Sequence, residues 1–207
     1  NGWQVAVHTQ GDQAIEKTLN VFESANISNN SRHRLEHCLL PDTNSLERMA
    51  NLGVLPSFHI NHLWYYGEAL ENHIIGKKRT EQILPLKKAE NASLKYSLHA
   101  DQPMFKSKPL SLLHTAVNRR TRDGRIINTK NKISVMSGLK ALTINAAWQI
   151  KMEDKIGSIA PGKYADFVII DQNPLTIDST KIKDIQVLQT IVNGNTIYKK
   201  YSTILNH

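Results

Sequence analysis

The sequence is poor in cysteine, because Cys38 is the only one in 207 residues. A single thiol excludes an intrachain disulfide and a cysteine-rich zinc module. The chain also lacks any apolar run of about 20 residues, the length that a membrane-spanning helix needs, so we expect no membrane partner. Internal repeats and low-complexity segments are absent too. With 40% hydrophobic and 21% charged residues, the composition is typical of a globular protein of one or two domains.

Acidic residues are fewer than basic ones, 18 against 26, and the formal net charge is +8. The lysines and arginines are scattered, apart from two short clusters at residues 77–79 and 119–125. A nucleic-acid-binding protein carries a basic stripe or a reader motif, and this sequence has neither. The charge therefore indicates solubility or weak attraction to anions, and we expect no nucleic-acid partner.

The sequence has no initiator methionine either. It begins with Asn1-Gly2-Trp3, just ahead of a strand-like segment. We therefore expect the sequence to be a piece of a longer protein. Any signal peptide would precede it, so the compartment is unknown and the cytoplasm is only the default expectation.

Strand-like and helix-like patterns alternate along residues 1–150. Strands are predicted at residues 3–8, 34–40, 54–58 and 94–99. Amphipathic patterns predict helices from an N-cap at Asp12 to residue 22, and at residues 41–52 (ended by Gly53), 80–89, 109–120 and 133–147. Residues 59–67 are predicted to form an aromatic loop. The repeated alternation indicates βα units, and thus an α/β fold with a parallel sheet.

The pattern changes beyond residue 150, where short strand-like segments lie at residues 156–161 and 165–171. Two more, at residues 187–192 and 196–200, flank Asn193-Gly194, which is a strong hairpin signal. We therefore predict two parts, a βα part over residues 1–150 and a small β part over residues 151–207.

Three strand-like segments of the first part end in residues that can bind a metal. They close on His8, on His37, and on Asp101, which stands at a sharp break before a proline. Neutral imidazole and carboxylate are the ligand types of zinc, and a catalytic site leaves one position for water. Asp101 could also act as a general base. The alternative is that each is an ordinary polar strand end.

Longer blocks of sequence surround these residues. They are HTQGDQA at residues 8–14, RHRLEH at 32–37, LGVLPSFHINHLWYYGE at 52–68, SLHADQP at 97–103, TAVNRRTRDG at 115–124, ALTINAAWQI at 141–150 and GSIAPGKYADFVIIDQNP at 157–174. In these blocks the chain resembles the amidohydrolase superfamily, specifically the family-3 branch of YtcJ-like and N-substituted formamide deformylase-like hydrolases. The resemblance runs nearly end to end. It implies a metal-dependent (β/α)8 TIM barrel that carries a β-sandwich built from both chain ends.

The resemblance also implies roles for single residues. His8 is similar to the metal ligand at the end of the fifth barrel strand, and His37 to that of the sixth. Asp101 is similar to the eighth-strand aspartate, which contacts the metal and shuttles the proton. We expect a divalent metal, with zinc the first choice.

The segment that follows the seventh strand shapes the substrate pocket in relatives. His62, Trp64 and Tyr65 are the substrate-binding candidates there, although the two aromatic residues could equally belong to the core. His99 lies two residues before Asp101 and faces the same side of a regular strand. We assign it to the substrate side of the site, with plain packing as the alternative.

The departures from the family pattern limit what the chain can do alone. The match begins at the fifth strand, so the first-strand His-x-His pair and the fourth-strand Lys or Glu have no counterpart. The chain then corresponds to the C-terminal half of the barrel, about strands 5–8 with their helices, plus part of the sandwich. We expect this fragment to be inactive and to hold no tightly bound metal.

For the whole protein we expect hydrolysis of amide-like C–N bonds, other than peptide bonds, in a small-molecule N-acyl or N-formyl substrate. The alternative is a catalytically silent regulatory or binding protein, as in relatives named as regulators of exoenzyme production. Four strands cut from a barrel leave two open edges and expose the Val, Leu and Ile side chains of the barrel interior. We therefore expect a homodimer.

Other polar residues have more ordinary interpretations. His33 and His114 are expected at the surface or in packing, and Glu36 in a salt bridge. Arg119, Arg120 and Arg122 could bind an anionic substrate group, but a solvated basic loop is the more natural interpretation.

Overall fold

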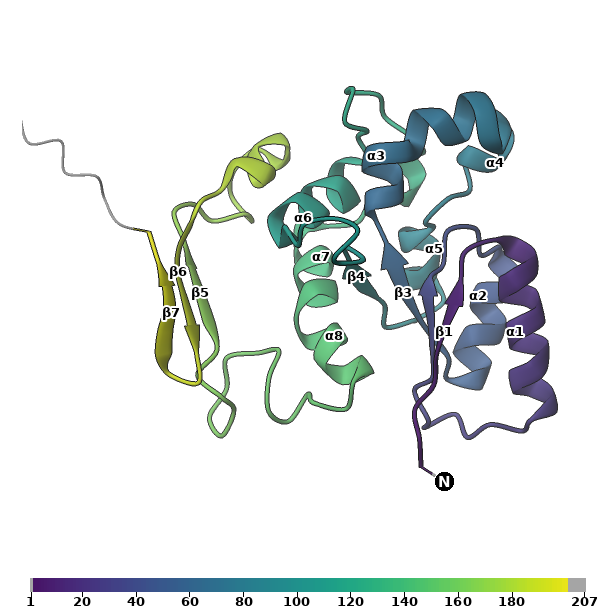
Figure 1. Ribbon diagram of the computed structural model, residues 1–207, viewed down its shortest axis with the longest axis horizontal. Coiled ribbons are helices and arrows are strands. Elements are labelled where there is room, and N and C mark those ends of the chain that lie inside the picture. The colour runs from purple at the N-terminus through teal and green to yellow at the C-terminus, as the bar shows by residue number, and fades with distance from the viewer. Residues whose placement is uncertain (1, 201–207) are drawn as a thin grey trace, which may run out of the picture.

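A four-stranded parallel sheet forms the centre of the protein, as Figure 1 shows in a computed structural model that describes residues 2–200. Its strands follow chain order, β1-β2-β3-β4, and every neighbouring pair is parallel. Their bounds are Ala6–Thr9, Arg34–His37, Leu55–His59 and Ser97–His99. Because each connection between parallel strands passes through helix, the chain always returns to the same end of the sheet. The predicted α/β fold with a parallel sheet is confirmed.

Two amphipathic helices cover one face of this sheet, α1 (Asp12–Ser24) and α2 (Thr43–Leu52) (Figure 1). The N-cap of α1 is Gly11, and Asp12 is the first helical residue. The predicted N-cap at Asp12 is therefore wrong by one residue. Asp42 caps α2, because its carboxylate accepts a hydrogen bond from the backbone N–H of Ser45 at 2.7 Å. Gly53 ends α2 in the left-handed region, with φ at 65°.

The remaining helices differ in part from the predicted ones. They are α3 (Asn61–Ala69), the π-helical turn η1 (Leu70–Ile74), α4 (Gly76–Thr80), α5 (Leu86–Asn91), α6 (Pro109–Asn118), the 3-10 turn η2 (Thr129–Asn131), α7 (Val135–Leu142) and α8 (Ile144–Gln149). The aromatic loop predicted at residues 59–67 is therefore mostly helix. The helix predicted at 80–89 begins only after Pro85, and the one at 133–147 breaks at Thr143, whose φ and ψ are −129° and −96°. Among the described residues, no helix has the length and apolarity needed to cross a membrane.

The C-terminal part forms a separate, three-stranded antiparallel sheet of β5 (Phe167–Ile170), β6 (Val187–Val192) and β7 (Asn195–Lys199), with the 3-10 turn η3 (Ser179–Asp184) between β5 and β6. The predicted hairpin at Asn193-Gly194 is confirmed, with φ of 48° and 77°. The strand predicted at residues 156–161 is wrong, because the chain turns there through Gly157 at φ 88°.

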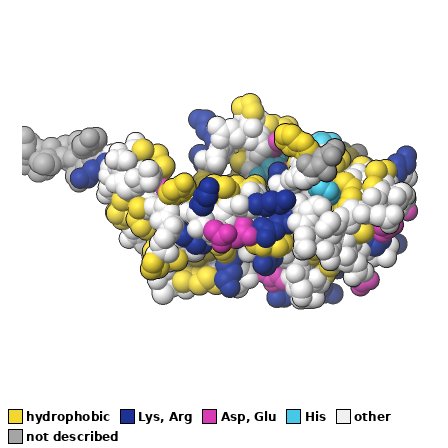
Figure 2. Space-filling model, turned by 90° about the horizontal axis from the view of Figure 1, so that it is seen from below, with side chains coloured by type: hydrophobic (Ala, Val, Ile, Leu, Met, Phe, Trp, Pro, Cys, Tyr) yellow, Lys and Arg dark blue, Asp and Glu magenta, His cyan; other side chains and the backbone are white. Residues whose placement is uncertain are grey.

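The surface of the antiparallel sheet is rich in hydrophobic side chains. Figure 2 shows them at the end of the molecule that holds these strands, and Val168, Ile197 and Tyr198 are each about half exposed or more. A sheet with both faces this open is consistent with part of a sandwich. The complete sandwich, the closed barrel and the boundary at residue 150 stay predictions.

The face of the parallel sheet that points away from α1 and α2 is mostly polar, with the buried Leu55 as an apolar exception. Strand alternation places Arg34, Glu36, Ser57 and Ser97 there, because Leu35 and Phe58 point into the core. Arg34 and Glu36 form an ion pair at 2.9 Å, so the salt bridge expected for Glu36 is present, but with a strand residue on this face and not on the helix side. The expectation that this face would expose Val, Leu and Ile is therefore wrong. A polar face of a sheet loses little stability when it contacts water.

The amino ends of β3 and β4 are held together by one residue at the end of α8. The Gln149 amide donates to the carbonyl oxygens of Pro56 (3.0 Å) and Lys95 (3.1 Å) and accepts from the Ser97 hydroxyl at 2.7 Å. Because this end of the sheet is anchored, the carboxyl ends of the same strands are set in a defined register.

Candidate metal centre

Five of the nine histidines gather at the carboxyl ends of the parallel strands. His8, His37, His59 and His99 stand at or next to the ends of β1 to β4, and His62 lies in the first turn of α3. The ring of His37 is central, with centroids 4.5 Å from His8, 5.1 Å from His99 and 5.8 Å from His59. A cluster of this kind needs the whole sheet to form.

The backbone turns sharply where these strands end. His37, Cys38 and Asp101 all have positive φ, at 73°, 44° and 56°. Non-glycine residues adopt this left-handed region uncommonly, and such strain collects at functional sites. At His37 the turn ends the strand's alternation, so its ring lies among the other imidazoles.

Three of these side chains could hold a cation. His37, His99 and Asp101 each offer one ligand atom, and these atoms all lie within 4.8 Å of one another. Ligands about 2.0–2.2 Å from a zinc ion lie at most ~4.4 Å apart. Small side-chain rotations would therefore bring the group to coordination distance.

Unsatisfied nitrogen atoms in the cluster also fit a metal. Within residues 2–200, His37 Nδ1, His59 Nε2, His62 Nδ1 and His99 Nε2 are buried and have no hydrogen-bond partner. An unpaired buried polar atom destabilises a fold by about 1–3 kcal/mol. Coordination to a cation would remove that penalty for the nitrogens that face it.

Burial favours the neutral form of four imidazoles of the cluster, those of His37, His59, His62 and His99. It lowers the pKa of His37 and His59 below the ordinary range, although the Asp101 carboxylate opposes the shift in both. Burial, and then repulsion by neighbouring imidazoles, lowers the pKa of His62 to about 3 and that of His99 to about 4. Neutral imidazole is the form that binds metals, so the cluster is ready for a cation at neutral pH.

Comparison with known proteins identifies the family. The family model described as "Amidohydrolase family" matches residues 1–198. The chain belongs to the amidohydrolase family. Membership of this family supports a hydrolase. The group of His37, His99 and Asp101 agrees with a metal-dependent enzyme.

Similar proteins include the N-substituted formamide deformylase of Arthrobacter pascens, 27% identical over 201 residues, which cover 96% of this chain and 37% of the relative. The putative amidohydrolase YtcJ of Bacillus subtilis is 28% identical over 206 residues, 96% of this chain and 38% of the relative. An uncharacterized metal-dependent hydrolase from Pyrococcus horikoshii has a TM-score of 0.74 at 25% identity, over 86% of this chain and 36% of that one. The amidohydrolase chain thus spans less than two fifths of the length of these relatives.

The predicted ligands lie together, but in a different grouping from the one expected. His37 and Asp101 form the compact group with His99, which was assigned to the substrate side. His8 is exposed at the edge strand β1, with its ring against that of His37. Which histidine completes the ligand set remains a prediction.

His59 is the cluster residue that sequence reasoning missed. It is 1% exposed, and its ring lies 4.2 Å from that of His62 and 5.0 Å from that of His99. The signal was present, since His59 directly follows the strand-like run at residues 54–58, as Asp101 comes just after the run at residues 94–99.

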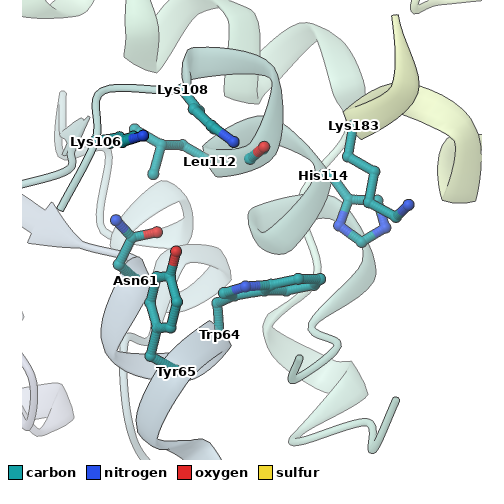
Figure 3. Close-up of a pocket in the computed structure, with 9 residues that line it drawn as sticks. Asn61, Trp64, Tyr65, Lys106, Lys108, Leu112, His114 and Lys183 are labelled. Atoms are coloured by element: carbon teal, nitrogen blue, oxygen red, sulfur yellow. The ribbon is translucent and has the colours of Figure 1, made fainter. Parts of the chain in front are cut away.

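The substrate-binding candidates separate into two places. His62 lies in the cluster, with its Nε2 atom 3.1 Å from the side-chain nitrogen of Gln10. Trp64 and Tyr65 instead line a neighbouring cavity of the amidohydrolase chain, between α3 and α6 (Figure 3). Their role in substrate binding stays a prediction.

Two residues outside the cluster have purely structural surroundings. His33 packs against Phe22 and accepts a hydrogen bond from the Val5 backbone N–H at 3.0 Å, as expected of a packing histidine. Arg119 is fully buried, so neither interpretation offered for it, an anion site or a solvated loop, is correct. Burial lowers the pKa of its guanidinium to about 9.

Proposed function

We propose that the protein to which this chain belongs is a metal-dependent hydrolase of amide-like C–N bonds, other than peptide bonds, in small molecules. The observation that carries the proposal is the group of His37, His99 and Asp101 at the carboxyl ends of parallel strands. In barrels built from such strands, this is the end where catalytic residues stand. The substrate class follows the name of the deformylase relative.

His37 and Asp101 would hold the metal, with His8 or His99 as a further ligand, and zinc suits this donor set best. When bound, a divalent cation polarises a carbonyl group and lowers the pKa of a water molecule that it binds. The buried imidazoles exclude bulk solvent from one side of the site and carry no positive charge that would repel the cation.

Asp101 is the proton carrier of the proposed reaction. Water adds to the amide carbon through its oxygen, and the proton that it loses passes to the Asp101 carboxylate. The C–N bond then breaks, and the same proton moves to the leaving nitrogen, which gives a free amine and a carboxylic acid. Asp101 can serve in this way because it is only partly buried and makes no ion pair among the described residues.

We also propose that the chain alone is inactive. We propose that the parallel sheet is the second half of a barrel, in which β1 and β4 pair with strands that lie outside this sequence. Open edges of this kind favour pairing with another chain, so we also propose that the isolated chain forms homodimers. A first-strand pair of histidines would complete the metal site in the whole protein.

Hydrolysis assays on the whole protein test the function. We expect turnover of N-formyl or N-acyl amides that a chelator abolishes and zinc restores. Asp101→Asn should reduce turnover by roughly a hundredfold or more, the usual range for loss of a general acid-base residue. The control is Asp123→Asn, because the Asp123 side chain is 59% exposed and does not belong to the group of possible metal ligands.

Two results would contradict the proposal. Full activity of the metal-depleted protein would remove the metal from the mechanism, and full activity of Asp101→Asn would remove the proposed proton carrier. A protein that binds zinc but turns over no amide would instead favour the regulatory alternative.

A further inference from the structure

A small cavity lies beside the candidate metal centre, between the start of α3, the loop before α6, α6 itself and η3 (Figure 3). Its volume is about 140 Å³. Tyr65 borders the cavity and stacks on Phe105 at 4.6 Å, and Phe105 in turn lies 5.4 Å from the ring of His59. The cavity is therefore a neighbour of the histidine cluster, with Phe105 between them.

The lining of this cavity is strongly positive. Lys106, Lys108 and Lys183 all contribute to it, and no carboxylate does among the described residues. Lys106 and Lys108 make no ion pair in the part of the chain that the structure describes. Lys183 pairs only with its neighbour Asp184, at 2.9 Å. A cleft lined by one sign of charge concentrates the field and attracts the opposite charge.

A buried histidine in the wall also lacks a partner. His114 is 2% exposed and lines the cavity, and its Nδ1 atom is buried without a hydrogen bond within the described residues. In a neutral imidazole, the hydrogen-bond partners decide which of the two ring nitrogens carries the proton. A ligand oxygen in the cavity would accept a hydrogen bond from Nδ1–H. It would thereby remove the destabilisation caused by a buried nitrogen without a partner.

The other walls are apolar and aromatic. The Trp64 ring lies across the cavity, with Tyr65 beside it and Leu112 opposite (Figure 3). A cavity of about 150 Å³ is known to accept benzene, so this one has room for a ring-sized body. The combination of ring-sized room, aromatic walls and two ammonium groups without an ion pair among the described residues favours an organic anion over an inorganic ion.

We propose that this cavity is a binding site for a small organic carboxylate, whose charged end meets the lysines and whose apolar body packs against Trp64. Binding there needs no metal and no turnover, so it can be tested on the chain as it is. It also stands if the proposed hydrolase activity fails.

The indole N–H signals of the ¹⁵N-labelled chain provide the test. The chain has three tryptophans, so each signal can be assigned by a single Trp→Phe substitution. Trp3 is 83% exposed, and Trp148 borders a different basic hollow with Lys95, Lys140 and Lys163. Titration with benzoate should shift the Trp64 signal saturably, and the signals of Trp3 and Trp148 should not change. Benzyl alcohol, of the same size without the charge, should bind far more weakly.

The charge contribution is tested by paired substitutions. Lys106→Met with Lys108→Met should weaken benzoate binding roughly tenfold or more, because two charged contacts are lost. Lys77→Met with Lys78→Met removes the same charge from exposed positions on α4 and should leave the affinity unchanged.

Three results would overturn the proposal. They are the absence of a saturable Trp64 shift, an equal shift of Trp148, and equal affinity of the Lys106/Lys108 and Lys77/Lys78 variants.

Discussion

Replacing Arg119 with lysine should destabilise the chain although the charge is kept. The guanidinium donates from Nη1 to the carbonyl oxygen of Leu84 (2.9 Å), from Nη2 to that of Ile83 (2.9 Å) and from Nε to that of Ile127 (3.2 Å). These bonds join the segment before α5 to the segment before η2. A single ammonium nitrogen cannot occupy three donor positions, so Arg→Lys is not a conservative change here.

The magnitude follows from the bonds lost. The substitution keeps one buried positive charge, so its desolvation largely cancels in the comparison. If lysine retains one of the three bonds, two are lost, each worth about 1.5–3 kcal/mol for a charged donor. The expected destabilisation is about 3–6 kcal/mol, a large part of a domain's ~5–15 kcal/mol. Leu84 has a second donor, the Leu86 backbone N–H at 2.8 Å, so the carbonyls of Ile83 and Ile127 would suffer most.

Urea unfolding followed by circular dichroism measures this loss as a lower midpoint at an unchanged slope. The matched control is Arg122→Lys, because that side chain is 61% exposed and its nearest carboxylate, Asp123, is 3.8 Å away. The control should stay within about 0.5 kcal/mol of the original chain. If Arg119→Lys does so too, the three carbonyl bonds do not stabilise the fold as argued.

Three further predictions concern pH, packing and assembly. The free energy of unfolding should fall between pH 7 and pH 5 by roughly 2 kcal/mol each for His62 and His99. Their pKa values in the folded chain are about 3 and 4, so in this pH range the unfolded chain binds protons that the folded chain does not. A flat profile in the metal-free chain would contradict this. Gly53→Ala should destabilise far more than Gly76→Ala, because a Cβ at Gly53 would lie 1.9 Å from the Asn29 carbonyl oxygen whereas the one at Gly76 meets nothing within 4 Å. Both glycines have positive φ, so urea midpoints of the two variants isolate the clash, and equal midpoints would show that Asn29 moves aside. Sedimentation velocity at low micromolar concentration should show a dimer, and a well-folded monomer would end that proposal.

Local sequence patterns predicted the elements whose stability is local. The helical period of Ile15, Leu19 and Phe22 identified α1, and the side chain of Asp42 with the positive φ of Gly53 set the bounds of α2. The same reasoning missed α3, whose N-terminus has no side-chain cap. Packing holds that helix in place. A Cβ at Gly67 would lie 2.7 Å from the side chains of both Thr121 and Ile127, a proximity invisible in sequence.

The sequence by itself determined which side chains stand at the strand ends. Histidines and an aspartate there predicted a cluster of possible metal ligands at one end of a parallel sheet, because the carboxyl ends of parallel strands share an edge, and the structure brings His37, His99 and Asp101 together at that end. Which of them meet depends on register between strands far apart in the chain. His59 pairs with His99 in the register of β3 and β4, and the left-handed backbone at His37 turns its ring toward both.

Only the tertiary structure decided which charges are buried and which are free. Arg119 and Arg122 look alike in sequence, yet one is fully buried on carbonyl oxygens and the other is exposed. Lys106 and Lys108 precede α6, and Lys183 lies far along the chain in η3, yet the fold brings all three to one cavity. Local propensity carries no information on such contacts, because they depend on how α3, α6 and η3 pack together.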